Sequence, residues 1–311
     1  MRIAIVGSGA VGGYFGAKLA RSGQDVIFIA RGAHLEAIRA QGLQIRSAKL
    51  GDFLVHAPAH EDTRDVGEVD LVLFAVKAYD NQDAIRLLPP LIGRNTVVLT
   101  VQNGVDSSME IAQAVGEAHV LGGTTYVATA LEAPGLIVQT GVHRSILFGE
   151  LFGTRLEVTP RVRAIADILG PADIQVTPVA DAWVPIWDKF VYLVPFSGST
   201  GAARLPIGPV WSHPEVQRMF YAAAREVAAI AAAEGVAISP DRFDRLEEYM
   251  NNIPPSTRSS LLIDLEAGKR IEVEALQGAA VRRGARHGVP TPIVSTLYAL
   301  LKPWERGAVS K

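Results

Sequence analysis

The chain of 311 residues contains no cysteine. This absence excludes disulfide bonds, a thiol nucleophile and thiolate metal sites, and it is compatible with a reducing compartment. Positive and negative charges nearly cancel, giving a formal net charge of −2, and no basic tract is interleaved with aromatic residues. A nucleic-acid partner is therefore not expected, and no metal site is predicted.

Long uninterrupted apolar segments are also missing. The most alanine-rich stretch, residues 222–233, is broken by Arg225 and Glu226, so it is expected to form a buried helix rather than a membrane span. The apolar run at the start stops at Gly7, which is too short for a signal peptide. These features predict a cytoplasmic protein without a membrane partner, and the length favours two domains.

A glycine-rich motif directly follows the first apolar run, residues 2–6. It comprises Gly7, Ser8, Gly9, Ala10, Val11 and Gly12. In dinucleotide sites the first glycine permits a tight turn, the second admits the pyrophosphate, and the third lets the next helix approach the sheet. That helix then offers free N–H groups and a positive dipole end to the phosphates. An amphipathic stretch and a second apolar run at 26–29 follow, so a dinucleotide site is favoured over an ordinary glycine-rich turn.

The end of the second apolar run indicates which dinucleotide is bound. NAD sites usually place Asp or Glu there, whereas NADP sites place an arginine near the 2′-phosphate. Here Arg31 follows Ile29 and Ala30 without an acidic neighbour. Because a guanidinium forms charge-assisted hydrogen bonds with phosphate, the predicted cofactor is NADPH/NADP+. The alternative is an Arg31 that simply faces solvent.

The pattern of the chain changes near Pro178. Before it, short apolar runs alternate with helical patterns, which predicts a Rossmann-type, doubly wound α/β sheet. After it, long helical patterns at 214–234 and 270–287 predict an all-helical region. We therefore predict an NADP-binding domain over residues 1–178 and a helical substrate-binding and catalytic domain over residues 179–311.

Further strands are expected within the first of these regions. The candidate runs are 71–76, 96–101 and 173–177, together with a hairpin-like pair between 120 and 149 that turns at Pro134-Gly135. Ligands of open α/β sheets bind outside the carboxyl ends of the strands. The substrate is therefore expected to meet the nicotinamide there, beneath the helical region.

Several polar residues could carry chemistry. Lys77 and Asn103 each follow a predicted strand, although an asparagine before a glycine is also a common turn signal. Lys189 lies in an otherwise apolar stretch, where an isolated lysine is more often a surface residue. Ser260 and Glu272, taken alone, indicate a helix start and a solvated face. Residue types alone therefore predict an NADP-dependent two-domain reductase and nothing finer.

Taken in order, these motifs resemble the ketopantoate reductase (2-dehydropantoate 2-reductase) family over nearly the whole chain. The matching positions are the glycine motif, Arg31, Val76-Lys77-Ala78, Gln102-Asn103-Gly104, Trp187-Asp188-Lys189-Phe190, Ser259-Ser260, Glu272 and Gly278. The resemblance implies hydride transfer from NADPH to the 2-keto carbon of a small-molecule 2-keto acid. The implied substrate is ketopantoate, reduced to pantoate for pantothenate and coenzyme A synthesis.

The resemblance also assigns roles. Lys189 matches the catalytic lysine and Glu272 the substrate-binding glutamate, so these two form the predicted catalytic pair. Ser260 matches the serine that holds the substrate carboxylate, Asn103 an active-site asparagine, and Lys77 a lysine of the cofactor site. A lysine ammonium can stabilise the oxyanion that forms on hydride transfer and protonate it. Homodimer formation is left open.

Two positions depart from the family. It usually has asparagine four and eight residues after the catalytic lysine, where this chain has Leu193 and Ser197. Pro195 lies between them and disfavours continuous helical turns; Ser197 is kept as a candidate substrate contact. The alternative function is thus a related reductase of a more apolar keto acid or ketone. A non-catalytic NADP sensor is less favoured, because Lys189 and Glu272 are both retained.

Overall fold

A computed structural model of the chain describes residues 1–308, which divide into two compact units. The first unit comprises Met1–Gln102 and Ser107–Pro185. The second comprises Asn103–Asp106 and the residues from Ile186 onward. A Rossmann-type α/β unit followed by a helical unit confirms the predicted fold class.

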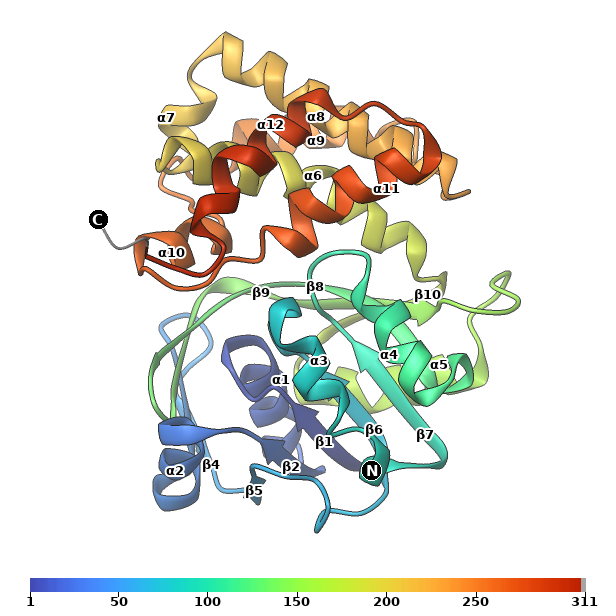
Figure 1. Cartoon of the computed structure of the whole chain (residues 1–311). Helices are drawn as coiled ribbons and strands as arrows, with labels where there is room; N and C mark the ends of the chain where they lie inside the picture. Colours follow the sequence, from blue (N-terminus) through green and yellow to red (C-terminus); the bar gives the residue numbers. More distant parts are fainter. Residues whose placement is uncertain (309–311) are drawn as a thin grey trace. The chain divides into compact units, whose positions relative to one another are not determined.

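The first unit is built on a mixed sheet of ten strands, coloured blue to yellow-green in Figure 1. The strands are β1 (Arg2–Val6), β2 (Asp25–Ile29), β3 (Leu43–Ser47), β4 (Phe53–Val55), β5 (Ala59–His60), β6 (Val69–Phe74), β7 (Ile92–Thr100), β8 (Val120–Ala133), β9 (Leu136–Glu150) and β10 (Gln175–Asp181). Their order is β4-β3-β9-β8-β7-β6-β1-β2-β5, with β10 paired to β9. The run β5-β2-β1-β6-β7-β8 is parallel throughout, in the order typical of dinucleotide-binding sheets.

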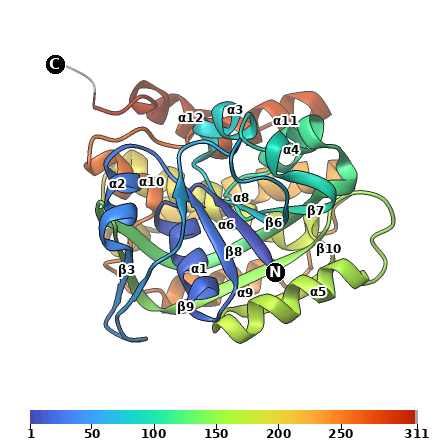
Figure 2. The same cartoon turned by 90° about the horizontal axis from the view of Figure 1, so that it is seen from below.

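Helices cover both faces of this sheet. They are α1 (Ala10–Arg21), α2 (Gly32–Gln41), α3 (Asn81–Ile85), α4 (Ser107–Val115) and α5 (Pro160–Leu169). In Figure 2, α1 and α5 lie on one side of the strands and α3 and α4 on the other. The core beneath α1 is apolar: Ile5 on β1, Phe15 on α1 and Phe28 on β2 are fully buried. This packing fixes the glycine motif at the carboxyl end of β1.

The second unit contains helices and no strand within residues 186–308. Its helices, yellow to red in Figure 1, are α6 (Trp183–Ala203), α7 (Ile207–Trp211), α8 (Pro214–Ala233), α9 (Arg242–Asn252), α10 (Ser260–Glu266), α11 (Ala279–His287) and α12 (Pro292–Leu301). Trp187, Phe190 and Phe220 are buried in its core. None of the helices in residues 1–308 combines the length and hydropathy needed to cross a bilayer.

One local expectation about a helix was wrong. The expected helix over 270–287 does not begin at Arg270. Residues 271–273 are consecutively buried, which one amphipathic helical face cannot provide, and a π-helical turn, η5 (Glu274–Gly278), precedes α11. Pro195 does not end α6, because it removes only one N–H from a helix whose flanking residues, Val194 and Phe196, are buried.

Candidate active site

The glycine motif forms the turn between β1 and α1. Gly7 has φ +93°, and a Cβ there would lie 2.6 Å from the backbone N of Val76. A Cβ on Gly12 would lie 2.2 Å from the Gly7 carbonyl oxygen, so this glycine lets α1 start close to the strand. At Gly9, by contrast, a Cβ would meet no atom within 4 Å. The chain's own packing therefore does not require glycine at position 9, whereas a ligand against that backbone would.

The start of α1 supports the same interpretation. Gly9 is its N-cap, no side chain caps it, and its first turn contains no acidic residue. The first amides of a twelve-residue helix therefore face outward with the positive end of the helix dipole. Ser8 stabilises the turn from below, since its hydroxyl donates hydrogen bonds to the carbonyl oxygens of Ile5 and Ile29 at 3.1 and 3.0 Å. The geometry fits a bound pyrophosphate.

A histidine that the sequence interpretation missed also holds this turn. His34 Nδ1 accepts a hydrogen bond from the Gly135 N–H at 3.0 Å, so Nε2 carries the proton and donates it to the Ser8 carbonyl oxygen at 2.7 Å. Burial lowers the pKa of His34, which favours this neutral form. Only the tertiary fold brings these three residues together, and no local sequence signal could have identified them.

Arg31 lies where the sequence analysis expected it, directly after β2 and at the N-terminus of α2. Its side chain is 70% exposed, and its guanidinium donates to Asp80 Oδ2 at 2.7 Å. Asp80 belongs to the short 3₁₀ turn η1 (Ala78–Asp80), which follows Lys77. Arg31 is thus accessible to a phosphate. It also has an acidic neighbour, Asp80, which lies far from it in the sequence and was therefore not predicted.

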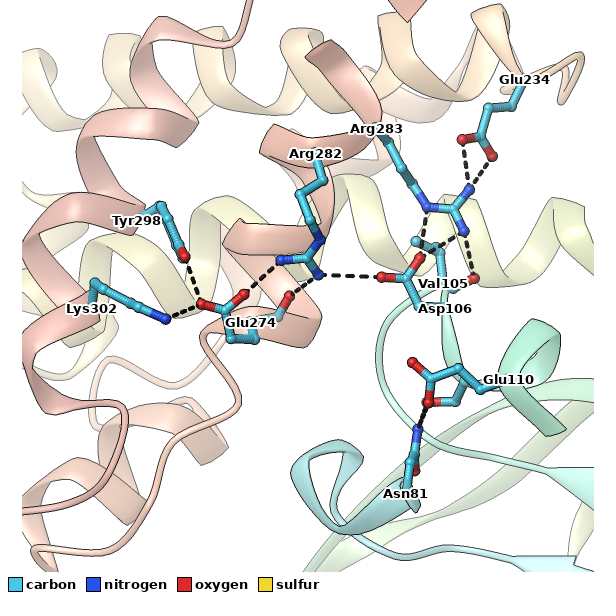
Figure 3. A network of polar contacts seen from close by, with 11 residues as sticks. Asn81, Val105, Asp106, Glu110, Glu234, Glu274, Arg282, Arg283, Tyr298 and Lys302 are labelled. Atoms are coloured by element: carbon cyan, nitrogen blue, oxygen red, sulfur yellow. Dashed lines mark hydrogen bonds and ion pairs between the residues drawn. The ribbon is translucent and has the colours of Figure 1, made fainter. Parts of the chain in front are cut away.

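Hydrogen bonds fix the segment around Lys77. Gln102, which follows β7, donates through Nε2 to the Val76 carbonyl oxygen at 2.8 Å and to Asn81 Oδ1 at 2.7 Å. Asn81 in turn donates to Glu110 Oε2 at 2.6 Å (Figure 3). Gln102 therefore ties together the carboxyl ends of β6 and β7. It was part of the matching motif, but its structural role was not foreseen.

The second unit brings three of the expected residues together. Lys189 on α6 donates from Nζ to Asn103 Oδ1 at 2.9 Å. Burial lowers the pKa of Lys189 to about 8, and the nearby charge of Glu272 opposes that shift. Glu272 is only 7% exposed, so the expectation of a solvated face at this position was wrong. A buried ammonium that lies beside an amide and a carboxylate is suited to proton donation.

The two serines predicted to contact the substrate, Ser260 and Ser197, occupy different environments. Ser260 is exposed at the start of α10, while Ser259 is the N-cap and accepts the Leu262 N–H at 3.1 Å. Ser197 is fully buried: its hydroxyl donates to the Leu193 carbonyl oxygen at 2.7 Å and accepts from Gln277 Nε2 at 2.9 Å. The hydrogen bonds of Ser197 are thus used inside the unit. This placement favours a packing role over the expected substrate contact.

Comparisons with known proteins identify the family of the chain. The ketopantoate reductase PanE/ApbA family matches residues 3–153, and the C-terminal part of that family matches residues 181–305. The chain belongs to the ketopantoate reductase family. It is therefore an oxidoreductase of an NAD(P)-dependent family that acts on small keto acids.

Relatives with curated names and solved structures are similar along their full length. A 2-dehydropantoate 2-reductase of Mesorhizobium japonicum is 33% identical, with 100% of each chain covered. The uncharacterized oxidoreductase YkpB of Bacillus subtilis is 28% identical, over 98% of this chain and 99% of that one. The crystal structure of a PanE/ApbA family ketopantoate reductase from Ralstonia eutropha has a TM-score of 0.89 at 31% identity, with 98% of both chains covered. A D-mandelate dehydrogenase at 24% identity shares the fold, with a TM-score of 0.89.

Proposed function

We propose that this protein reduces a 2-keto acid with NADPH, and that ketopantoate is the first substrate to test. The observation that carries the proposal is the environment of the Lys189 ammonium. It donates a hydrogen bond to Asn103 and interacts electrostatically with Glu272. The relatives named 2-dehydropantoate 2-reductase support the choice of substrate. Their reaction implies a role in pantothenate synthesis.

The cofactor is assigned to the first domain, residues 1–178 in the sequence interpretation. The amides of the glycine motif would hold the pyrophosphate, and Arg31 the 2′-phosphate that distinguishes NADPH from NADH. Lys77 and Asn103 would contact the cofactor as well. When bound, NADPH supplies the hydride.

The helical domain, residues 179–311, is assigned the acid and the substrate contacts. Lys189 stabilises the negative charge that develops on the carbonyl oxygen and gives that oxygen its proton. Asn103 orients the ammonium, and the charge of Glu272 keeps it protonated. The exposed hydroxyl of Ser260 is the candidate contact for the substrate carboxylate.

The test is NADPH oxidation with a panel of 2-keto acids, using the unmodified protein and two lysine variants. Lys189→Ala should lower kcat by about 10²–10⁴-fold, the usual range for a positioned acid, with little change in NADPH affinity. Lys269→Ala removes an exposed lysine of the same unit and should leave kcat unchanged. Tight NADPH binding with no keto acid reduced would instead favour the sensor alternative.

A second candidate is a reductase of a more apolar keto acid. The observation that favours it concerns two positions on α6: Leu193 is apolar, and the hydroxyl of Ser197 makes its hydrogen bonds within the protein. The panel therefore includes 2-keto acids with apolar tails. A homodimer and a cytoplasmic location stay predictions.

A further inference from the structure

Loop 103–106 belongs to the second unit although its sequence neighbours, β7 and α4, belong to the first. Asn103 at its start is the residue bonded to Lys189. Gly104 follows with φ +96°, and a Cβ there would lie 2.7 Å from the Ala275 carbonyl oxygen of η5. The loop is therefore packed tightly against the segment that follows Glu272.

One side chain anchors the other end of this loop. Arg283 on α11 is only 8% exposed; its Nε donates to Asp106 Oδ1 at 2.9 Å, and a terminal nitrogen forms an ion pair with the same oxygen at 2.7 Å. That terminal nitrogen donates its hydrogen bond to the Val105 carbonyl oxygen at 3.0 Å. The remaining terminal nitrogen donates to both carboxylate oxygens of Glu234 (Figure 3). Each of the three guanidinium nitrogens thus has a hydrogen-bond partner.

The arrangement gives Arg283 a directional role. Glu234, at the end of α8, accepts hydrogen bonds from one side of the guanidinium, and loop 103–106 accepts hydrogen bonds from the other side. A planar fork of donors that is held in this way has one orientation, which a lysine could not reproduce. Arg282 adds a longer contact to Asp106 at 3.4 Å and bonds mainly to Glu274 (Figure 3).

We propose that Arg283 is a positioning residue of the active site, which fixes loop 103–106 so that Asn103 holds the Lys189 ammonium in place. This inference rests on the proposed function, in which Lys189 is the acid. Arg283 itself acts through the loop and is not assigned any contact with substrate. A misplacement of about 1 Å at the reacting group can cost about a hundredfold in rate, so the anchor controls kcat.

The network offers matched variants. Asp106→Asn weakens the loop side and keeps the pair of Arg283 with Glu234, whereas Glu234→Gln weakens only the opposite side. Arg283→Gln removes both, and Arg286→Gln makes the same substitution at an exposed position of the same helix. Each full-length variant is compared by thermal unfolding, so that a general loss of stability is measured separately.

The first measurement is amide hydrogen exchange over residues 103–106. Asp106→Asn and Arg283→Gln should raise exchange there by about tenfold or more, Glu234→Gln by less than either because Arg283 keeps its bonds to the loop, and Arg286→Gln should change it by less than about threefold. The second is the rate at which acetic anhydride acetylates Lys189, with Lys269 as internal reference. This rate should rise in the first two variants because Asn103 no longer holds the ammonium in a fixed position. Both measurements are independent of turnover.

The third measurement is kinetic. With the keto acid that the unmodified protein reduces best, Asp106→Asn should lower kcat by about 10–100-fold, with KM and NADPH affinity within about threefold. If the unmodified protein reduces no keto acid, the proposed function fails, and exchange and acetylation still decide the inference. Unchanged loop exchange in Asp106→Asn and Arg283→Gln, or an equal increase in Arg286→Gln, would overturn it.

Discussion

At the scale of single residues, burial changes what Lys189 can do. An exposed lysine has a pKa near 10.4 and holds its proton firmly at neutral pH. Burial brings the pKa of Lys189 to about 8, so the residue is still mostly protonated at pH 7 and releases its proton more readily. A lowered pKa with one carboxylate neighbour is common at functional sites. The sequence showed the lysine, but only the fold showed its burial.

This burial predicts a pH dependence of keto acid reduction. Since the acid must be protonated, kcat/KM should fall as pH rises through about 8. The charge of Glu272 raises the pKa of Lys189, so Glu272→Gln should move that fall to lower pH. Glu274→Gln, two residues away, is the control and should leave its position unchanged. A profile that stays flat to about pH 10, the pKa range of an exposed lysine, would remove Lys189 from the role of acid.

A second residue-scale prediction concerns Arg31. Two charge-assisted hydrogen bonds to a 2′-phosphate favour NADPH over NADH by about a hundredfold or more, and Arg31→Ala should remove most of that preference. Asp80 competes for the same guanidinium, so Asp80→Asn should increase the preference by about two- to fivefold, as for an exposed ion pair. Arg86→Ala, at another exposed arginine paired with an aspartate, is the control. Equal dissociation constants for the two cofactors in the unmodified protein would contradict the assignment.

At the scale of elements, the glycine motif separates packing from binding. Gly12→Ala would press a methyl group against the Gly7 carbonyl oxygen, and such overpacking costs about 1–3 kcal/mol. Gly9→Ala meets open space, so Tm should stay within about 2 °C of the unmodified value. NADPH affinity should nevertheless fall by about tenfold or more, because the methyl group occupies the side from which a pyrophosphate approaches. Thermal unfolding and NADPH titration of both variants provide the check, and normal affinity in Gly9→Ala would place the phosphates elsewhere.

The elements that were predicted well from the sequence are those with strong hydrophobic periodicity or a clear terminating residue. Strands β1, β2 and β7 and helix α8 follow apolar runs or a regular helical pattern, and the end of α8 coincides with Gly235. Strands β3, β4 and β5 were not predicted; β4 has three residues and β5 two. Their pairing depends on distant partners, so local pattern carries little signal. The π-helical turn after Glu272 was missed for the same reason.

At the scale of the whole molecule, the order of residues along the chain does not reveal the contacts of loop 103–106. Asn103 was predicted from its place after a strand, and Asp106 was not singled out. Contacts assign this loop to the helical unit, through Arg283 far along the chain. A sequence places residues in order, and it does not show which distant side chain will bind a loop. The predicted division at residues 178 and 179 stays a prediction about domains.

Substrate choice also depends on elements far apart in sequence. The family usually has two asparagines after the lysine of α6, and this chain has Leu193 and Ser197. The Ser197 hydroxyl accepts a hydrogen bond from Gln277 Nε2 on η5 and donates one to the Leu193 carbonyl oxygen. Neither position therefore offers a free amide to a substrate hydroxyl. A polar substrate group that loses one partner binds more weakly by about 1–3 kcal/mol.

The last prediction follows from this difference. The unmodified protein should reduce a 2-keto acid with an apolar tail more efficiently than ketopantoate, and Leu193→Asn should shift the ratio of kcat/KM values toward ketopantoate by about 10–100-fold, because it restores an amide. Ser197→Ala is the control: its hydroxyl bonds are internal, so it should lower Tm and leave the ratio within about threefold. The measurement compares ketopantoate with 2-keto acids of similar size that lack the terminal hydroxyl. A preference for ketopantoate above about a hundredfold in the unmodified protein would show that its pocket recognises the hydroxyl through other residues, and that the two replacements are neutral for substrate choice.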